Sequence, residues 1–272
     1  MSLIFIRRLV IFSIIVCTFS TMTPAVHANS NSIFIDQPTQ LTPIDVVVGL
    51  SRPPFVIERG DKGYEIELVT AILKTMEYQP KFMYVPLGRT LRMLDQGMGA
   101  MLLTINNNIV PNSTIRTNPY ITYQNRAVYK SDTKVSVTKF ADLRNLRVVA
   151  FQGATKYLGS EFASAVRYNK NYFEVPNQLQ QVRLLLEGRI DVAVMEENIF
   201  LHVLELVKPK PSDEQAEITS EDFNFAPLFP PNNYSAAFKD PSLVPIFNSA
   251  LDDFKGTEEF KKLKAKYNIK NQ

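Results

Sequence analysis

The sequence predicts an α/β protein built from two βαβαβ lobes. Short apolar runs typical of buried strands alternate with amphipathic stretches of helical period, from residue 44 to 104 and again from 146 to 195. Strand–helix–strand alternation favours a parallel sheet, because the connecting helix packs back across the sheet. The two stretches also end alike, since Gly97 precedes the last strand of one and Gly188 precedes the last strand of the other.

The first lobe is predicted from a regular succession of elements after a polar lead-in at 29–43. Ile66, Val69 and Leu73 share one face of the first helix, which is the pattern of a helix packed against a sheet. In order, we expect a strand at 44–50, a helix at 65–76, a strand at 81–85, a helix at 87–95 and a strand at 99–104.

The second lobe repeats that order. We expect a strand at 146–151, a helix at 155–166, a strand at 172–175, a helix at 178–187 and a strand at 190–195. The polar, β-prone segment 121–137 is the expected first connection between the lobes, and the proline-flanked segment 209–230 is expected to be irregular. A strand at 234–238 and helices at 243–254 and 258–267 complete the chain.

Length and composition are those of a globular protein. The chain has 272 residues, of which 45% are hydrophobic and 21% charged, enough for one large domain or two smaller ones. The formal charge is +3, but Arg7 and Arg8 lie in a segment expected to be removed, which leaves 28 basic and 27 acidic residues. This near balance argues against binding to nucleic acid or to a membrane surface.

Residues 1–28 have the pattern of a cleaved secretory signal. Arg7 and Arg8 precede an apolar run at 9–19. The small-residue spacing at 26–28 marks a cleavage site after Ala28. The apolar run is too short for a comfortable transmembrane helix, which makes an uncleaved anchor the lesser alternative. We therefore expect a mature protein that begins at residue 29 and is located in the periplasm.

Cysteine and histidine are almost absent from the expected mature chain. Cys17 lies in the signal after Val16, where a lipid-modified cysteine would need a small neighbour, and His27 is also removed. His202 stands among apolar residues and is interpreted as a packed side chain. These counts exclude disulfides, a cysteine nucleophile, and metal sites built from thiolates or several histidines. They almost exclude a Ser-His-Asp triad or a Cys-His dyad. We expect no metal, cofactor or catalytic residue.

The turn at 152–155 joins a buried strand to a helix start. Gly153 can adopt the positive φ that such a turn often needs, and Thr155 is an acceptable N-cap. The unpaired N–H groups of a helix start suit an anion such as a ligand carboxylate or phosphate. For this turn alone, an ordinary strand-to-helix connection is the simpler interpretation.

Open parallel sheets bind ligands beyond the carboxyl ends of their strands, so polar residues there are candidate ligand contacts. The candidates are Phe55, Arg89, Thr104, Asn106, Gln152, Gly153, Thr155 and Glu196. Such a set suits a small polar, even zwitterionic, ligand held in a cleft between two lobes. Simpler alternatives exist: Phe55 as a core aromatic, Arg89 as a surface ion-pair partner and Glu196 as an exposed loop charge.

Several short motifs, in the right order, resemble one family, the bacterial periplasmic solute-binding proteins of the polar amino-acid type, family 3 of the extracellular solute-binding proteins. The resemblance covers about residues 44–267. Its motifs are PPF at 53–55, GYEIEL at 63–68, the helix leading to glycine at 89–97, NPY at 118–120, QGAT at 152–155 and GRIDVAV at 188–194.

The resemblance implies a type II periplasmic binding protein-like fold with two hinge crossings. One lobe would comprise 29–126 and 228–272, and the other would be inserted at 127–227. The ligand would stack on Phe55 and touch Thr104, while the 152–155 turn and Glu196 would approach from the other lobe. Glu196 stands where the family usually has an aspartate for the ligand's amino group.

One feature of the family's amino-acid binders has no counterpart. They hold the ligand carboxylate with an arginine that would fall near Ile109 or Val110, yet residues 93–115 contain neither arginine nor lysine, and Ala154 replaces a common hydroxyl. Burying a carboxylate without a charged partner costs several kcal/mol. We therefore expect ordinary α-amino acids to bind weakly, and we expect a polar or cationic ligand that engages Glu196, with any anionic group near Arg89.

The leading functional hypothesis is a monomeric binding protein that closes on a small polar solute by a hinge. It would serve an inner-membrane ABC permease or a sensor protein. The alternative is an enzyme on the same fold, a dehydratase-like catalyst acting on a small carboxylic acid with Glu196 or Glu197 as acid or base. A binder returns its ligand intact, whereas an enzyme returns a different compound.

Overall fold

The computed structural model describes residues 40–210 and 217–269. The chain divides into two units, Met1–Pro38 and Thr39–Gln272, and everything below concerns the second. The predicted signal sequence and most of the lead-in therefore lie outside the described residues. Among the described residues, no helix is long and apolar enough to cross a membrane.

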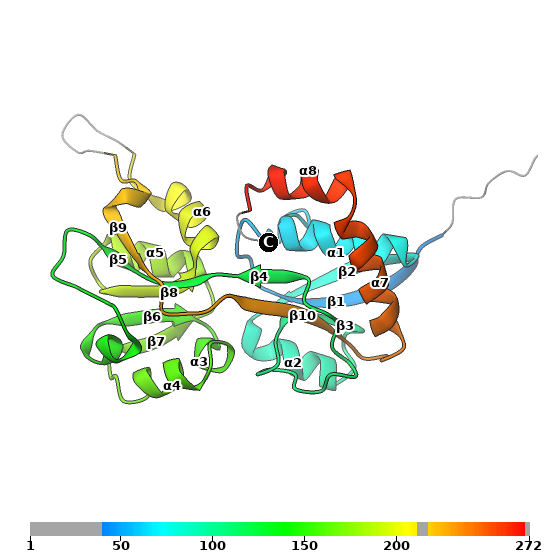
Figure 1. The fold of residues 1–272 in the computed structure, drawn as a ribbon, viewed down its shortest axis with the longest axis horizontal. Helices are drawn as coiled ribbons and strands as arrows, with labels where there is room; N and C mark the ends of the chain where they lie inside the picture. The colour runs from blue at the N-terminus through cyan, green and yellow to red at the C-terminus, as the bar shows by residue number, and fades with distance from the viewer. Residues whose placement is uncertain (1–39, 211–216, 270–272) are drawn as a thin grey trace, which may run out of the picture. The chain divides into compact units, whose positions relative to one another are not determined.

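The first sheet has the strand order β2-β1-β3-β10-β4 (Figure 1). Strand β1 pairs in parallel with β2 and β3, whereas β10 runs antiparallel to both β3 and β4. The bounds are Thr42–Gly49 for β1, Tyr78–Val85 for β2, Met101–Ile105 for β3, Ile121–Tyr123 for β4 and Asn232–Phe238 for β10.

The second sheet has the order β7-β6-β8-β5-β9. Strand β6 pairs in parallel with β7 and β8, and β5 runs antiparallel to β8 and β9. The bounds are Asn125–Lys130 for β5, Val148–Phe151 for β6, Tyr172–Val175 for β7, Val192–Glu196 for β8 and Phe223–Ala226 for β9. Each sheet with its helices is called a lobe below.

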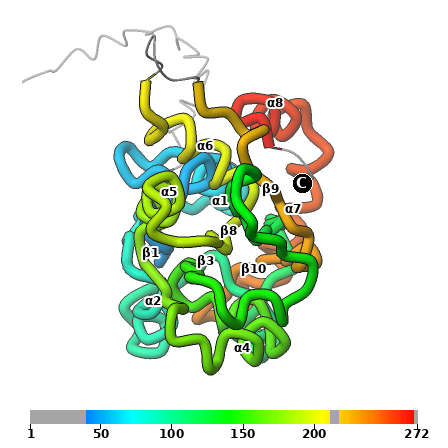
Figure 2. Tube along the Cα trace, turned by 90° about the vertical axis from the view of Figure 1, so that its left-hand side faces the viewer, coloured from blue at the N-terminus to red at the C-terminus, as the bar shows by residue number. Residues whose placement is uncertain are grey.

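Helices cover both faces of each sheet, which explains why the central strands β3, β6 and β8 are buried along their whole length. Figure 1 shows α1, α7 and α8 on one side of the first sheet and α2 on the other. Figures 1 and 2 both place α5 and α6 on one side of the second lobe and α4 on the other. The bounds are α1 Tyr64–Thr75, α2 Leu87–Asp95, α3 Ala154–Tyr157, α4 Ser160–Val166, α5 Gln178–Leu186, α6 Glu197–Val207, α7 Leu243–Lys255 and α8 Glu258–Lys266.

The α/β fold class is confirmed, but the purely parallel sheets are wrong, because each sheet also contains antiparallel strands. The segment 121–137, expected to be a β-prone connection between the lobes, contributes β4 to one sheet and β5 to the other. The segment 209–230, expected to be irregular, contains the 3-10 helix Ser220–Asp222 and strand β9. A second 3-10 helix, Phe140–Asn145, precedes β6.

Two helical predictions also need correction. The single helix expected at 155–166 is divided into α3 and α4 at Gly159, whose φ of +94° is incompatible with a continuous α-helix. Helix α6 follows β8 directly and was not expected.

The chain passes between the two sheets twice. The first crossing lies between the end of β4 at Tyr123 and the start of β5 at Asn125. The second lies between the end of β9 at Ala226 and the start of β10 at Asn232. The lobe boundaries expected at 126–127 and 227–228 stay a prediction, and they lie close to these crossings.

Candidate functional site

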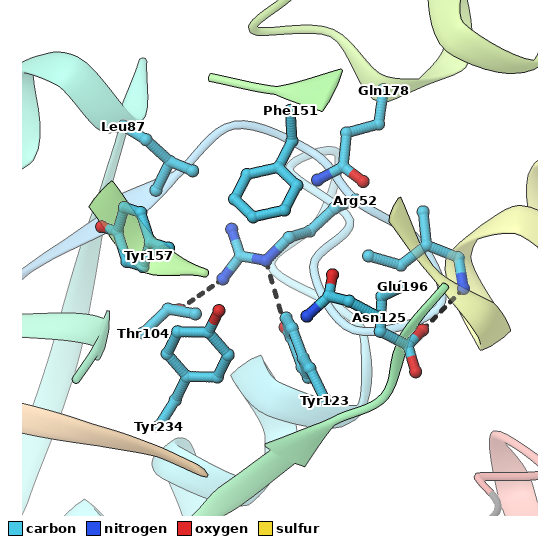
Figure 3. Close-up of a pocket in the computed structure, with 11 residues that line it drawn as sticks. Arg52, Leu87, Thr104, Tyr123, Asn125, Phe151, Tyr157, Gln178, Glu196 and Tyr234 are labelled. Carbon is cyan, nitrogen blue, oxygen red and sulfur yellow. Dashed lines mark hydrogen bonds between the residues drawn. The ribbon is translucent and has the colours of Figure 1, made fainter. Parts of the chain in front are cut away.

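A small cavity lies between the two sheets, beyond the carboxyl ends of β1, β3, β6 and β8 (Figure 3). Its volume is about 20 Å³, which is room for about one water molecule. Its walls come from both lobes and are rich in aromatic rings. The lining residues are Arg52, Leu87, Thr104, Tyr123, Asn125, Phe151, Tyr157, Gln178, Glu196, Ile199 and Tyr234.

Arg52, in the loop after β1, places its guanidinium at one end of the cavity (Figure 3). Its Nη2 donates to Glu65 Oε2 at 2.7 Å and to Thr104 Oγ1 at 2.5 Å, and its Nε donates to the Tyr123 hydroxyl at 3.1 Å. The Arg52 side chain is 4% exposed and that of Glu65 is fully buried. A buried ion pair of this kind holds only if the remaining polar atoms are also bonded.

Glu65 meets that condition. Its carboxylate also accepts hydrogen bonds from the hydroxyl groups of Thr104, Tyr120 and Tyr123. Burial by itself lowers the pKa of Arg52, but the neighbouring Tyr123 and Glu65 outweigh it and raise that pKa above its ordinary value. The guanidinium is therefore charged, and its Nη1 meets only the Leu50 carbonyl oxygen at a long 3.5 Å. At least one N–H group of Nη1 is left for another partner.

Thr104, near the carboxyl end of β3, has a φ of +56°, a backbone conformation that β-branched residues rarely adopt. Its backbone N–H donates to the Tyr120 hydroxyl at 3.0 Å, and its own hydroxyl bonds to Glu65 and Arg52. Strained backbone of this type persists only where the surroundings fix it, and it gathers at functional sites.

Glu196 closes the opposite end of the cavity at the junction of β8 and α6. Its Oε2 accepts from the Ile199 N–H at 2.8 Å as the N-cap of α6, and its Oε1 accepts from Asn198 Nδ2 at 2.8 Å. The residue is 2% exposed. Burial raises the pKa of Glu196 to about 7, against the opposing effect of these hydrogen bonds.

No cation neutralises Glu196 within residues 40–210 and 217–269. The nearest arginine on β5, Arg126, forms its ion pair at 2.9 Å with Glu197 instead. A buried carboxylate without a cationic partner either takes up a proton or awaits a positive charge from outside the chain.

The turn expected to bind a ligand anion is already occupied by the chain itself. The carboxylate of Glu174, on β7, accepts from the backbone N–H of Gly153 at 2.7 Å and of Thr155 at 3.0 Å, and from the Thr155 hydroxyl at 3.0 Å. Gly153 does adopt the expected positive φ, at +86°. The donors at this turn are therefore present as predicted, but an internal carboxylate takes the place expected for the ligand.

Phe55 and Arg89 do not line the cavity. The Phe55 ring is fully buried in the core of the first lobe, 4.5 Å from the ring of Tyr123 and 6.3 Å from that of Tyr64. Tyr123, the neighbour of Phe55, lines the cavity, whereas Phe55 does not. Arg89 is exposed on α2, so the guanidinium of the site is that of Arg52.

Asn106 and Gln152 link the two lobes instead of lining the cavity. Asn106 Nδ2 donates to the Tyr157 carbonyl oxygen at 3.1 Å, and the Gly88 N–H donates to Gln152 Oε1 at 3.3 Å. Of the predicted contacts, Thr104 and Glu196 line the cavity. The place expected for the family's arginine is apolar, with Val110 buried.

Sequence reasoning missed most of the cavity wall. Arg52 lies just after the strand predicted at 44–50, and a charged residue close behind a buried strand was a usable signal. Asn125 lies at the first crossing and Gln178 at the start of α5, where polar residues are common for other reasons. Tyr157 and Tyr234 were not among the predicted contacts. Among the described residues, no group of acidic, histidine or cysteine side chains could hold a metal ion.

Comparisons with known proteins agree with this architecture. Residues 44–270 match the family model of the bacterial extracellular solute-binding proteins, family 3. Comparison with curated protein sequences gives no match. Among solved structures, an ancestral arginine-binding protein bound to arginine has a TM-score of 0.68 at 18% identity, over 84% of this chain and 99% of that chain.

Two further solved structures show how widely the fold is used. A histidine kinase sensor domain with similarity to periplasmic binding proteins has a TM-score of 0.67 at 18% identity, over 84% of this chain and 96% of that chain. The ancestral amino-acid-binding protein AncCDT-1, a precursor of cyclohexadienyl dehydratase, has a TM-score of 0.63 at 18% identity, over 83% and 95%. At these identities the structures show the fold alone, and the family rests on the match over residues 44–270: the chain belongs to the bacterial extracellular solute-binding proteins, family 3.

Proposed function

We propose that the chain captures a small polar solute bearing a cationic group, which neutralises Glu196 inside the cavity between the lobes. The observation that carries this proposal is the burial of Glu196, without a cationic partner in the described chain, in a cavity walled by both lobes. A ligand ammonium or similar group supplies the missing charge at the cavity end of the carboxylate.

The opposite end suits an anionic or acceptor group. The Nη1 atom of Arg52 has only a long bond to the Leu50 carbonyl oxygen and keeps one N–H group free, while Tyr123 and Glu65 hold Nε and Nη2 in place. The expectation that α-amino acids bind weakly rested on the absence of an arginine near Val110, with Arg89 as the alternative guanidinium. Arg52 brings a guanidinium to the cavity from another loop, so we no longer infer weak binding from that absence. A zwitterion that spans from Arg52 to Glu196 therefore fits the charges of the site.

Ligand entry requires movement, because a cavity of about 20 Å³ is too small for a solute of amino-acid size. The two crossings between the sheets supply two thin hinges, and opening about them separates the walls without changing either lobe. Small-angle scattering tests this step. The radius of gyration is expected to fall when a confirmed ligand is added to an open population, and a value unchanged across ligand concentrations in a protein shown to bind would contradict hinge closure.

The transport role follows from the family, and we propose it for this chain in the periplasm, after removal of residues 1–28. A substrate-binding protein of an amino-acid ABC transporter shares the fold, and so does a histidine kinase sensor domain. Delivery to an ABC permease and presentation to a sensor both require closure on the solute. Adjacent permease and ATPase genes would favour delivery.

The test is a thermal-shift search with the purified mature protein over metabolite mixtures, followed by calorimetry on each hit. A ligand that binds only the folded protein raises Tm in a concentration-dependent way. Glu196→Gln should abolish the shift. The matched control is Glu197→Gln, which alters the adjacent carboxylate that pairs with Arg126 and does not line the cavity. Equal binding by wild type and Glu196→Gln would contradict the proposal.

An enzyme is the second candidate, and one observation favours it. With a pKa of about 7, Glu196 can both accept and donate a proton near neutral pH. One structural neighbour is a precursor of cyclohexadienyl dehydratase. Against an enzyme, the other titratable side chains lining the described cavity, Arg52 and three tyrosines, have raised pKa values that keep them far from neutrality. Mass spectrometry of each hit after incubation separates the two functions, because a binder returns the compound unchanged.

A further inference from the structure

Two side-chain amides that line the cavity have polar atoms without any hydrogen-bond partner. They belong to Asn125, the first residue of β5, and Gln178, the first residue of α5. Asn125 is 1% exposed and Gln178 is 8% exposed. The unpaired atoms are Asn125 Nδ2, a donor, and Gln178 Oε1, an acceptor. Figure 3 shows both amides directed toward the middle of the cavity.

Such atoms are unusual, because buried polar groups in folded proteins nearly always have a partner. An unpaired buried donor or acceptor lowers the stability of the folded chain, so its presence needs an explanation. Neither amide serves the local backbone. Helix α5 is capped by Asn177, whose side chain accepts from the Leu179 N–H at 3.0 Å, so Gln178 is not needed for that role.

The charged residues of the cavity do not use these amides either. Both oxygens of Glu196 are bonded within the start of α6, and Arg52 is bonded to Glu65, Thr104 and Tyr123. One free donor and one free acceptor therefore face the same small space from the second lobe.

We propose that Asn125 and Gln178 form a specificity subsite for a neutral ligand group that presents an acceptor and a donor side by side, namely a carboxamide. Its carbonyl oxygen accepts from Asn125 Nδ2 and its N–H donates to Gln178 Oε1, which pairs both orphan atoms at once. A carboxylate in the same place offers no donor and leaves Gln178 Oε1 facing negative charge. This subsite rests on the proposed function, because it selects among solutes that the same cavity captures.

The test uses Asn125→Leu and Gln178→Met, which keep side-chain size and remove the amide. The matched control is Gln181→Met. Gln181 is a fully buried amide on the same helix whose Oε1 is also unpaired, but it does not line the cavity, so it tests whether an unpaired atom affects ligand choice only where it faces the ligand. Without ligand, both cavity variants should melt at or above the wild-type Tm, because an unsatisfied polar group is removed. A marked fall in Tm would show that the amides have structural partners, and it would overturn the proposal.

Binding is measured by calorimetry with two matched pairs, L-glutamine against L-glutamate and L-asparagine against L-aspartate. Wild type and Gln181→Met should prefer the amide of at least one pair by about tenfold or more, and each cavity variant should reduce that preference to within about threefold. Equal affinity within both pairs in the wild type, or an unchanged preference in both cavity variants, would overturn the subsite.

The failure of the subsite is distinguishable from failure of the proposed function. If wild type binds none of the four probes, the carboxamide assignment is overturned. A hit from the metabolite mixtures that is lost in Glu196→Gln would at the same time uphold solute capture. If no compound shifts Tm in a Glu196-dependent way, both the carboxamide assignment and the proposed function are overturned.

Discussion

Replacing Glu196 by glutamine should remove a pH dependence of stability that this one carboxyl creates. Burial raises its pKa from 4.5 to about 7 in the folded protein. The folded state therefore binds a proton more tightly than the unfolded state, and stability is greatest below about pH 4.5 and is lost as pH rises through about 7. At about 1.4 kcal/mol per pH unit, the loss is about 3 kcal/mol in all.

Urea unfolding of the ligand-free protein between pH 4.5 and 8 measures this effect. The free energy of unfolding of the wild type, relative to that of Glu196→Gln at the same pH, should fall by about 3 kcal/mol across that range. One other shifted group acts in the same range with the opposite sign: burial lowers the pKa of His202 from 6.5, so its contribution to stability is lost as pH falls, equally in both proteins. The remaining shifted groups act outside that range. Asp142, Asp191 and Asp240 have lowered pKa values, so their contributions are lost only below about pH 4, and Tyr123 titrates well above 10. Parallel curves for the two proteins would refute the burial argument.

A cationic ligand should show the opposite trend. It binds the ionised carboxylate, so with a pKa of about 7 the affinity should rise about tenfold from pH 6 to pH 8 and release a proton to the buffer. Calorimetry in buffers of different ionisation enthalpy reports that proton. An affinity independent of pH in the wild type would show that the ligand's cation does not contact Glu196.

Three further substitutions test the rest of the site. Phe55→Ala should cost about 3–5 kcal/mol of stability and leave affinity within about twofold, because this ring lies in the core; a stable variant with weak binding would restore the stacking role. Arg52→Met should cost about 3–5 kcal/mol by leaving Glu65 buried and unpaired, and adding Glu65→Gln should recover part of it in urea unfolding; no recovery would contradict the pairing. Glu174→Ala should cost about 1–3 kcal/mol by freeing the donors of the 152–155 turn, and melting unchanged from wild type would show that those bonds contribute little.

The fold could be predicted because its signals are local. Alternating apolar runs and helical periods place most strands and helices within a few residues of their observed bounds. The direction of a strand is not encoded in its period, so the antiparallel β5 and β10 could not be distinguished from parallel strands. Helix α6 was predictable and was missed, since Ile199, Phe200 and Val203 have helical spacing and its N-cap is Glu196.

The site could be predicted only as far as the carboxyl ends of the strands define it. That rule finds Thr104 and Glu196, which lie at the carboxyl ends of β3 and β8. It cannot say which partner a donor will choose. The backbone donors at Gly153 were placed correctly, but a carboxylate on the neighbouring strand β7 reaches them first, and that competition depends on side-chain geometry across the sheet.

Arg52 shows that residues from different places in the sequence can reach the same place in the site. The family's arginine would follow β3, and here that place is taken by buried Val110. Strands β1 and β3 pair in parallel, so the loops after them leave the same edge of the sheet. A guanidinium from the loop after β1 can therefore enter the cleft that the loop after β3 would serve. Arg52 does so, and its bond to the Thr104 hydroxyl on β3 holds the charge over that neighbouring strand. Because the Tyr123 hydroxyl accepts from Nε and Glu65 accepts from Nη2, Nη1 is the nitrogen with a donor to spare, and we expect a single-ended contact with an acceptor instead of a bidentate clamp.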